Sequence, residues 1–126
     1  MKILVLNAGS SSQKSRLYDI QGSLPNAPQA PLWEAYADWG EHAGVITMKI
    51  KTASGQSLEE SVHTDSRTEV IRHLLETLWS GKTQVLAQPA DIDIVGHRIV
   101  HGGKDYVEPT RITSSVKDAI KQLAEF

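Results

Sequence analysis

Residues 1–20 read MKILVLNAGSSSQKSRLYDI, and this stretch decides the fold. Its apolar run at residues 3–6 ends at a small polar turn, residues 7–12. A short continuous apolar run of this kind predicts a strand buried on both faces. Residues 14–20 regain apolar character and predict a second strand, antiparallel to the first across the turn.

The next segments extend this sheet. Apolar and polar residues alternate over 33–39 and again over 45–51, which predicts two further strands. The connections between the first four strands are too short for crossover helices, so they favour an antiparallel meander. Another strand is predicted later in the chain, over 91–100.

Two helices follow from spacing and capping signals. Ser66 and Glu69 fit a capping box, the apolar residues that follow recur at helical spacing through Trp79, and Gly81 stands where a helix-ending glycine is expected. Residues 115–126 predict the second helix, with Ser115 as its N-cap. The meander, the first helix, the later strand and the second helix come in that order.

Composition excludes several functional classes. The 126 residues include 13 Lys and Arg against 15 Asp and Glu, a net charge of −2, so a polybasic nucleic-acid or membrane-surface protein is excluded. Cysteine is absent, which excludes disulfides and thiolate metal sites. The apolar run at residues 3–6 is too short for a signal peptide or a membrane span. We therefore expect a soluble, cytoplasmic, single-domain protein with no nucleic-acid or membrane partner.

The turn at residues 7–12 suggests phosphate binding, but not of the P-loop type. A P-loop requires G-x-x-x-x-G-K-[ST] followed by a helix whose N-terminus faces the phosphate. Here the second glycine is missing, Lys14 comes one residue early, and a strand-like segment follows. Both the sequence and its context exclude a P-loop.

A phosphate-binding hairpin fits the same turn better. Small side chains let backbone N–H groups approach an anion, and the hydroxyls of Ser10, Ser11 and Ser12 can donate further hydrogen bonds. Lys14 adds a positive charge, and Asn7 offers a neutral oxygen suited to Mg²⁺ or to a water in its shell. An ordinary hairpin turn remains the alternative, because Asn, Gly and Ser are common in all turns.

A second cluster, GHRIVHGG, occupies residues 96–103. Its glycines permit close backbone approach and unusual dihedral angles. Arg98 ends a strand expected to be central, so its guanidinium either forms a structural ion pair or binds an anionic ligand. His97 and His101 would lie on the same face of an extended segment, but no third ligand is nearby. A role as hydrogen-bonded scaffold residues is therefore favoured over a zinc site.

Together, ILVLNAGSSSQK (residues 3–14) and VGHRIVHGG (residues 95–103) resemble the acetate kinase family of the actin/sugar-kinase/Hsp70 superfamily. The resemblance implies an α/β, ribonuclease-H-like fold. Its mixed sheet would have antiparallel first strands and flanking helices. It also implies that residues 1–126 are the incomplete N-terminal domain of a longer two-domain enzyme, which acts as a homodimer.

The resemblance assigns roles residue by residue. Asn7 matches the asparagine associated with Mg²⁺, Ser10 and Ser12 lie in the turn that approaches the phosphates of ATP, and Lys14 matches the ATP-binding lysine. Arg98 matches a catalytic arginine that contacts the acyl substrate and the transferring phosphoryl group. The implied reaction converts ATP and acetate into ADP and acetyl phosphate, in either direction.

Two alternatives remain beside acetate kinase. A propionate or butyrate kinase would carry the same motifs, because these motifs serve the phosphoryl group and do not size the acyl pocket. A non-catalytic nucleotide-binding module is the other possibility. The resemblance places the remaining catalytic groups downstream, so we expect the 126-residue chain alone to be inactive.

Overall fold

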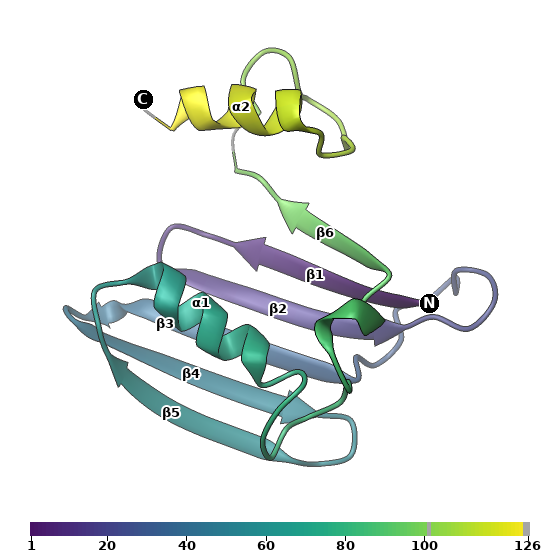
Figure 1. Cartoon of the computed structure of the whole chain (residues 1–126), viewed down its shortest axis with the longest axis vertical. Helices are drawn as coiled ribbons and strands as arrows, with labels where there is room; N and C mark the ends of the chain where they lie inside the picture. The colour runs from purple at the N-terminus through teal and green to yellow at the C-terminus, as the bar shows by residue number, and fades with distance from the viewer. Residues whose placement is uncertain (101, 125–126) are drawn as a thin grey trace.

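The computed structural model of the chain describes residues 1–100 and 102–124, apart from the side chains of residues 41 and 42. The elements are β1 Lys2–Ala8, β2 Ser12–Asp19, β3 Trp33–His42, β4 Val45–Thr52, β5 Ser57–His63, α1 Arg67–Glu76, the short 3-10 helix η1 Pro89–Asp91, β6 Ile94–Arg98 and α2 Ser114–Leu123. Helix α1 lies across one face of the sheet, and α2 lies beyond β6 (Figure 1).

Over the described residues the strands form one six-stranded mixed sheet in the order β5-β4-β3-β2-β1-β6. Strands β1 to β5 form an antiparallel meander, as predicted, and β6 joins β1 in parallel. The predicted α/β class and mixed sheet are therefore confirmed. Strand β5 was not predicted, because its inward positions include only two apolar side chains, Leu58 and Val62.

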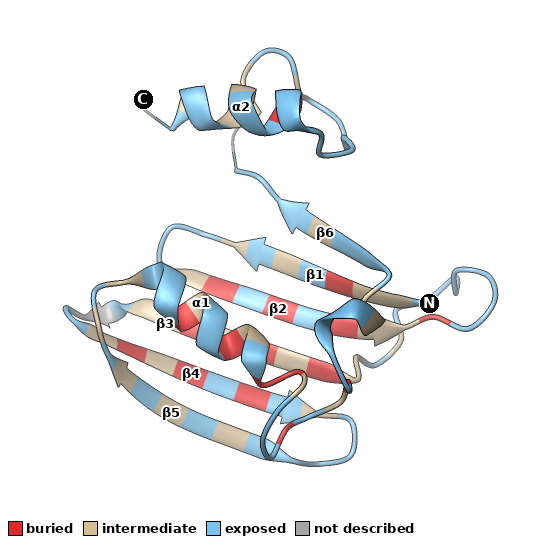
Figure 2. Ribbon diagram, viewed as in Figure 1, coloured by how far each residue is buried: buried red, intermediate tan, exposed pale blue. Residues whose placement is uncertain are grey.

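The core lies between the sheet and α1. Successive strand residues point to opposite faces, so every second side chain of β2, β3 and β4 is buried (Figure 2). Trp33 is fully buried, and its indole Nε1–H donates to Thr77 Oγ1 at 3.2 Å. The core residues packed around it include Leu4, Leu17, Ala35, Ala37, Ile46, Met48, Ile50, Val70, Leu74, Leu78 and Leu86.

The prediction that β1 is buried on both faces was wrong. Leu4 faces α1 and is 3% exposed, whereas Val5 on the opposite face is 37% exposed. Among the described residues, α1 is the helix that lies on this sheet, and it covers one face. We call the face turned away from α1, which carries Val5, Asn7 and Lys14, the open face.

The expected position of β6 also needs correction. The strand spans Ile94–Arg98 instead of residues 91–100, because Pro89–Asp91 form the 3-10 helix η1. Within the described residues β6 is an edge strand and not a central one. Its side chains are correspondingly exposed, with Ile94 at 48% and Val95 at 54%.

The start of α1 agrees with the sequence, although its capping box is only half formed. The Ser66 hydroxyl accepts a hydrogen bond from the Glu69 N–H at 3.3 Å, as predicted. The Glu69 carboxylate instead accepts from Thr64 Oγ1 at 3.0 Å, and the Ser66 N–H donates to the same hydroxyl oxygen at 3.1 Å. Thr64 thus bridges the two groups that a capping box would join directly.

Both helices differ from prediction in their bounds: α1 ends early, and α2 spans Ser114–Leu123 instead of 115–126, of which residues 125 and 126 lie outside the described residues. Helix α1 ends at Glu76, before Trp79, because the chain tightens there into i→i−3 hydrogen bonds; Gly81 follows with a φ of +81°. Helix α2 has Thr113 as its N-cap and not Ser115, because the Thr113 hydroxyl accepts from the Val116 N–H at 3.4 Å.

Among the described residues, neither helix has the length and apolar character that crossing a bilayer requires.

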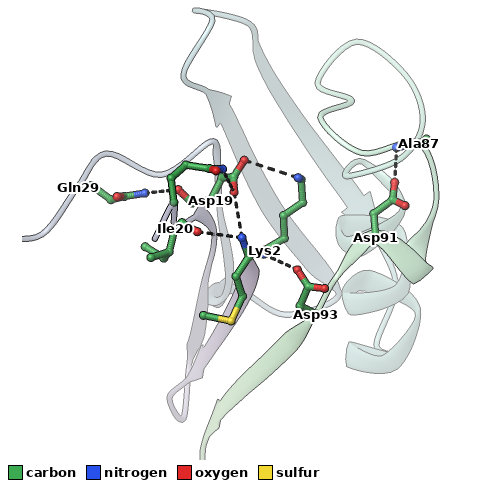
Figure 3. A network of polar contacts seen from close by, with 9 residues as sticks. Lys2, Asp19, Ile20, Gln29, Ala87, Asp91 and Asp93 are labelled. Carbon is green, nitrogen blue, oxygen red and sulfur yellow. Dashed lines mark hydrogen bonds and ion pairs between the residues drawn. The ribbon is translucent and has the colours of Figure 1, made fainter. Parts of the chain in front are cut away.

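A polar network fixes the beginning of β1 between its two neighbours (Figure 3). The Met1 amine donates to the Ile20 carbonyl at 2.8 Å and lies 3.5 Å from Asp19 Oδ1. The Lys2 N–H donates to Asp93 Oδ2 at 2.7 Å, and the Asp93 N–H donates to the Lys2 carbonyl at 3.0 Å. These bonds set the register of β2, β1 and β6, and therefore which residues meet at their far ends.

Candidate functional site

Three predicted site residues lie side by side on the open face. Asn7 on β1 is paired with Lys14 on β2 at one side and with Arg98 on β6 at the other. Partner residues on adjacent strands face the same side, and neighbouring strands lie about 4.8 Å apart, so the three Cα atoms span roughly 10 Å. All three residues are exposed. We call Lys14, Asn7 and Arg98 the cationic row.

The two cations of this row are free to bind an anion. Within residues 1–100 and 102–124, neither Lys14 nor Arg98 forms an ion pair, so the structural ion pair considered for Arg98 is not formed there. The neighbouring Arg16 behaves differently, because it lies 3.4 Å from Glu34. Its pKa is raised above the ordinary value, first by Tyr18 and then by Glu34.

The turn between β1 and β2 presents donors. The carbonyl of Ser12 accepts from the Gly9 N–H at 2.8 Å, and the carbonyl of Ser11 accepts from the Trp39 N–H at 3.0 Å. The carbonyl of Ser10 accepts from Trp39 Nε1–H at 3.1 Å. By contrast, the N–H groups of Ser10 and Ser11 donate to no group in the described part of the chain. A turn with occupied carbonyls and available N–H groups suits an anion.

The donors of this turn continue toward the cationic row. Ser12 begins β2 two residues before Lys14, so its side chain shares the open face with Lys14. The hydroxyls of Ser10, Ser11 and Ser12 form no hydrogen bond with other described residues. The turn and the row thus form one continuous surface of hydrogen-bond donors and positive charge at one end of β1.

The available ligands bear on whether Mg²⁺ fits this site. Across the described ranges, no three His, Asp or Glu side chains lie close enough together to hold a metal ion. Asn7 supplies one neutral oxygen, and its two partners in the row are cations. A magnesium ion bound to phosphates commonly needs only one or two protein ligands, because phosphates and waters supply the rest. The donor set therefore fits Mg²⁺ that arrives with a nucleotide.

Two lysines near the cationic row were not predicted as site residues. Lys49 and Lys51 of β4 help to line a hollow of about 270 Å³ on the open face, together with Lys14, Arg16, Glu34, Ala35 and Tyr36. In the sequence, the two lysines were marked only by their alternation with the apolar residues of the predicted strand at 45–51, which places them on its polar face. Their place on the same hollow as Lys14 depends on the register of three paired strands, which was not predicted from the sequence.

The cluster at residues 96–103 supports part of the scaffold hypothesis. His97 Nδ1 is 3.0 Å from the Arg98 carbonyl oxygen, consistent with a hydrogen-bonded scaffold role, while His101 lies outside the described residues. A Cβ on Gly102 would overlap the Tyr106 carbonyl, and Gly103 has a φ of +69°. At Gly96 a Cβ would meet no atom within 4 Å. The expected need for glycine is therefore met at Gly102 and Gly103.

The chain is similar in sequence to curated acetate kinases. The chain is 54% identical to an acetate kinase of Cyanothece sp. over 126 residues, which cover 100% of this chain and 31% of the relative. It is also 54% identical to an acetate kinase of Gloeobacter violaceus over 127 residues, with the same coverage. The chain therefore spans about a third of the length of these curated relatives.

Solved structures give the same picture. The crystal structure of Porphyromonas gingivalis acetate kinase matches with a TM-score of 0.74 and 27% identity, over 96% of this chain and 29% of that one. A propionate kinase from Francisella tularensis matches with a TM-score of 0.69 and 26% identity, over 98% and 29%. These neighbours support the predicted actin-like α/β domain. Residues 2–126 match the sequence profile of the Acetokinase family, and the chain belongs to that family.

Proposed function

We propose that this chain is the phosphate-binding part of an acetate kinase, which transfers a phosphoryl group between ATP and acetate to give ADP and acetyl phosphate. The observation that carries the proposal is the cationic row beside the donor-rich turn. Residues 1–126 would form part of the N-terminal domain of the enzyme. The similarity to acetate kinases along the whole chain supports this reading.

The turn and Lys14 would bind the phosphates of ATP. The N–H group of Ser10 and the hydroxyls of Ser10 and Ser12 are available as donors, and Lys14 adds a compact positive charge. Hydrogen bonds to charged groups contribute about 1.5–3 kcal/mol each. Several such contacts give an affinity suited to a nucleotide that must also be released.

Arg98 would act at the reacting atoms. It flanks Asn7 on the side opposite Lys14, so an acceptor bound at Arg98 would lie close to phosphates bound at the turn. The planar guanidinium can hold a carboxylate with two hydrogen bonds. As the phosphoryl group moves, the same guanidinium can neutralise charge that grows on its oxygens. Arg98 is therefore the proposed catalytic and substrate-binding residue of this chain.

Asn7 would hold Mg²⁺ through its side-chain oxygen, together with the nucleotide phosphates. Bound there, the metal would neutralise phosphate charge. The family resemblance also leads us to propose a cytoplasmic enzyme that assembles as a homodimer.

Propionate is the second candidate acceptor. The structural match to a propionate kinase is nearly as good as the match to an acetate kinase. The residues of the cationic row would bind a carboxylate and phosphates, and these groups are the same whether the acceptor is acetate or propionate. Acyl-chain length would be selected elsewhere in the protein.

The proposal is tested by trapping acyl phosphate with hydroxylamine. The complete polypeptide is incubated with MgATP and acetate, propionate or butyrate, beside the 126-residue chain and a control without acceptor. We expect hydroxamate from the complete polypeptide, most with acetate, and none above background from the 126-residue chain. A complete polypeptide inactive with every acceptor would overturn the proposed enzyme, and a preference for propionate would select the second candidate.

A further inference from the structure

We propose that Trp39 is a positioning residue for the phosphate-binding turn, an inference that rests on the proposed function. Trp39 is partly buried, and it donates two hydrogen bonds to consecutive carbonyls of the turn. Its backbone N–H donates to Ser11 at 3.0 Å, and its indole Nε1–H donates to Ser10 at 3.1 Å. One residue of β3 therefore holds the two carbonyls next to the proposed phosphate donors.

The pairing of β3 with β2 brings Trp39 to the turn, because Trp39 follows Asp38, the partner of Ser12, and its N–H donates to the carbonyl of the preceding Ser11. The pairing of β3 with β4 runs regularly to Asp38↔Thr47 and resumes at His42↔Val45, so residues 39–41 lie opposite a single residue of β4. Extra residues of this kind bend a strand and redirect its side chains. The bent segment lies close against the turn, because a Cβ on Gly40 would be only 3.0 Å from Ser11 Cβ.

Helix α1 holds the same indole from another element. The guanidinium carbon of Arg67, the first residue of α1, lies 4.9 Å from the centre of the Trp39 ring. A cation at this distance over an aromatic face is attracted to it. Asp38 Oδ1 also accepts from the Gly40 N–H at 2.9 Å, which fixes the backbone on the far side of Trp39. The indole is thus held by contacts that do not involve a ligand.

The bonds from Trp39 matter because a carbonyl oxygen repels a phosphate. With its oxygen bound to Nε1–H, the Ser10 carbonyl is held by the indole, and the N–H groups of the turn remain available to an anion. Without the indole N–H, this carbonyl would be free to rotate and to compete for those donors. Trp39 would thus act on nucleotide affinity through the turn.

Trp39→Phe in the complete polypeptide isolates this bond. Phenylalanine keeps the backbone N–H to Ser11 and a six-membered aromatic ring beside Arg67, and it removes the indole N–H together with the five-membered ring that carries it. Since one neutral hydrogen bond is lost, we expect the KM for MgATP to rise about three- to tenfold. The KM for acetate and the melting temperature should stay near wild type. Trp79→Phe, on the segment after α1, is the matched control and should change neither KM.

Intrinsic fluorescence reports whether MgATP binding reaches the surroundings of Trp39, while the difference between the two KM values separates positioning from a purely structural role. MgATP should change the tryptophan emission of the wild type and of Trp79→Phe, and the change should disappear in Trp39→Phe. An unchanged KM for MgATP in Trp39→Phe would overturn the inference, as would equal losses for both substrates with a lowered melting temperature. A wild type with neither acyl phosphate formation nor a response to MgATP would instead overturn the proposed function, and the inference with it.

Discussion

Arg98→Ala in the complete polypeptide should lower kcat for acyl phosphate formation at least about 100-fold, while the KM for MgATP changes less than about threefold. Arg98 ends β6 next to Asn7, is exposed, and has no ion-pair partner among the described residues. Its guanidinium is therefore available to charge that grows during phosphoryl transfer. An interaction stronger in the transition state than in the ground state affects kcat more than substrate binding. Steady-state kinetics with hydroxylamine trapping measure both constants.

Two further variants make the Arg98 result specific. Arg98→Lys keeps the charge but loses the planar fork, so it should recover only part of the lost kcat. Arg72→Ala removes an exposed arginine from α1, on the other side of the sheet, and should leave kcat near wild type. A kcat for Arg98→Ala equal to that of Arg72→Ala would refute the catalytic role.

Trp33→Ala should lower the free energy of unfolding of this domain by about 3–5 kcal/mol. Trp33 is 0% exposed, is packed in the core beneath α1, and donates to Thr77 Oγ1 at 3.2 Å. The substitution leaves a cavity in the layer that joins the sheet to the helix and also removes this hydrogen bond. A loss of this size corresponds to a large change in the folding equilibrium of a marginally stable domain.

Thermal unfolding of the complete polypeptide, followed by circular dichroism, checks this prediction. Leu24→Ala is the control, because Leu24 is 72% exposed in the loop after β2 and should change stability by less than about 0.5 kcal/mol. Equal melting temperatures for the two variants would show that Trp33 does not sit in the core of the folded protein.

Local signals in the sequence predicted most of the strands and helices. The alternation at 33–39 and 45–51 predicted β3 and β4, because every second position on those strands packs under α1. Ser66 predicted the start of α1, since a hydroxyl there accepts from a free N–H of the first turn. Ser115 was predicted to cap α2, but Thr113 is the N-cap, because its hydroxyl accepts from the Val116 N–H.

The composition of the site was visible in the sequence, but its arrangement was not. Asn7 and Arg98 are far apart in the chain, and they meet only because β6 pairs in parallel with β1 in the register set by Lys2 and Asp93. The contact of the Trp39 indole with Ser10 was not predicted either, because the register of β2 against β3 and the irregular end of β3 have no local sequence signal. Long-range pairing and irregular strand ends thus limited what the sequence could predict.

The most direct test of the central claim is the affinity of the complete polypeptide for MgATP, measured by isothermal titration calorimetry with Lys14→Ala and Lys82→Ala. Lys14 lies on the open face beside Asn7, whereas Lys82 is an exposed lysine after α1. Since Lys14 would make a charge-assisted contact with phosphate, its loss should weaken binding about 10- to 100-fold. Lys82→Ala should bind MgATP like the wild type. Equal affinity of Lys14→Ala and the wild type would contradict the claim that this turn and its lysine hold the phosphates.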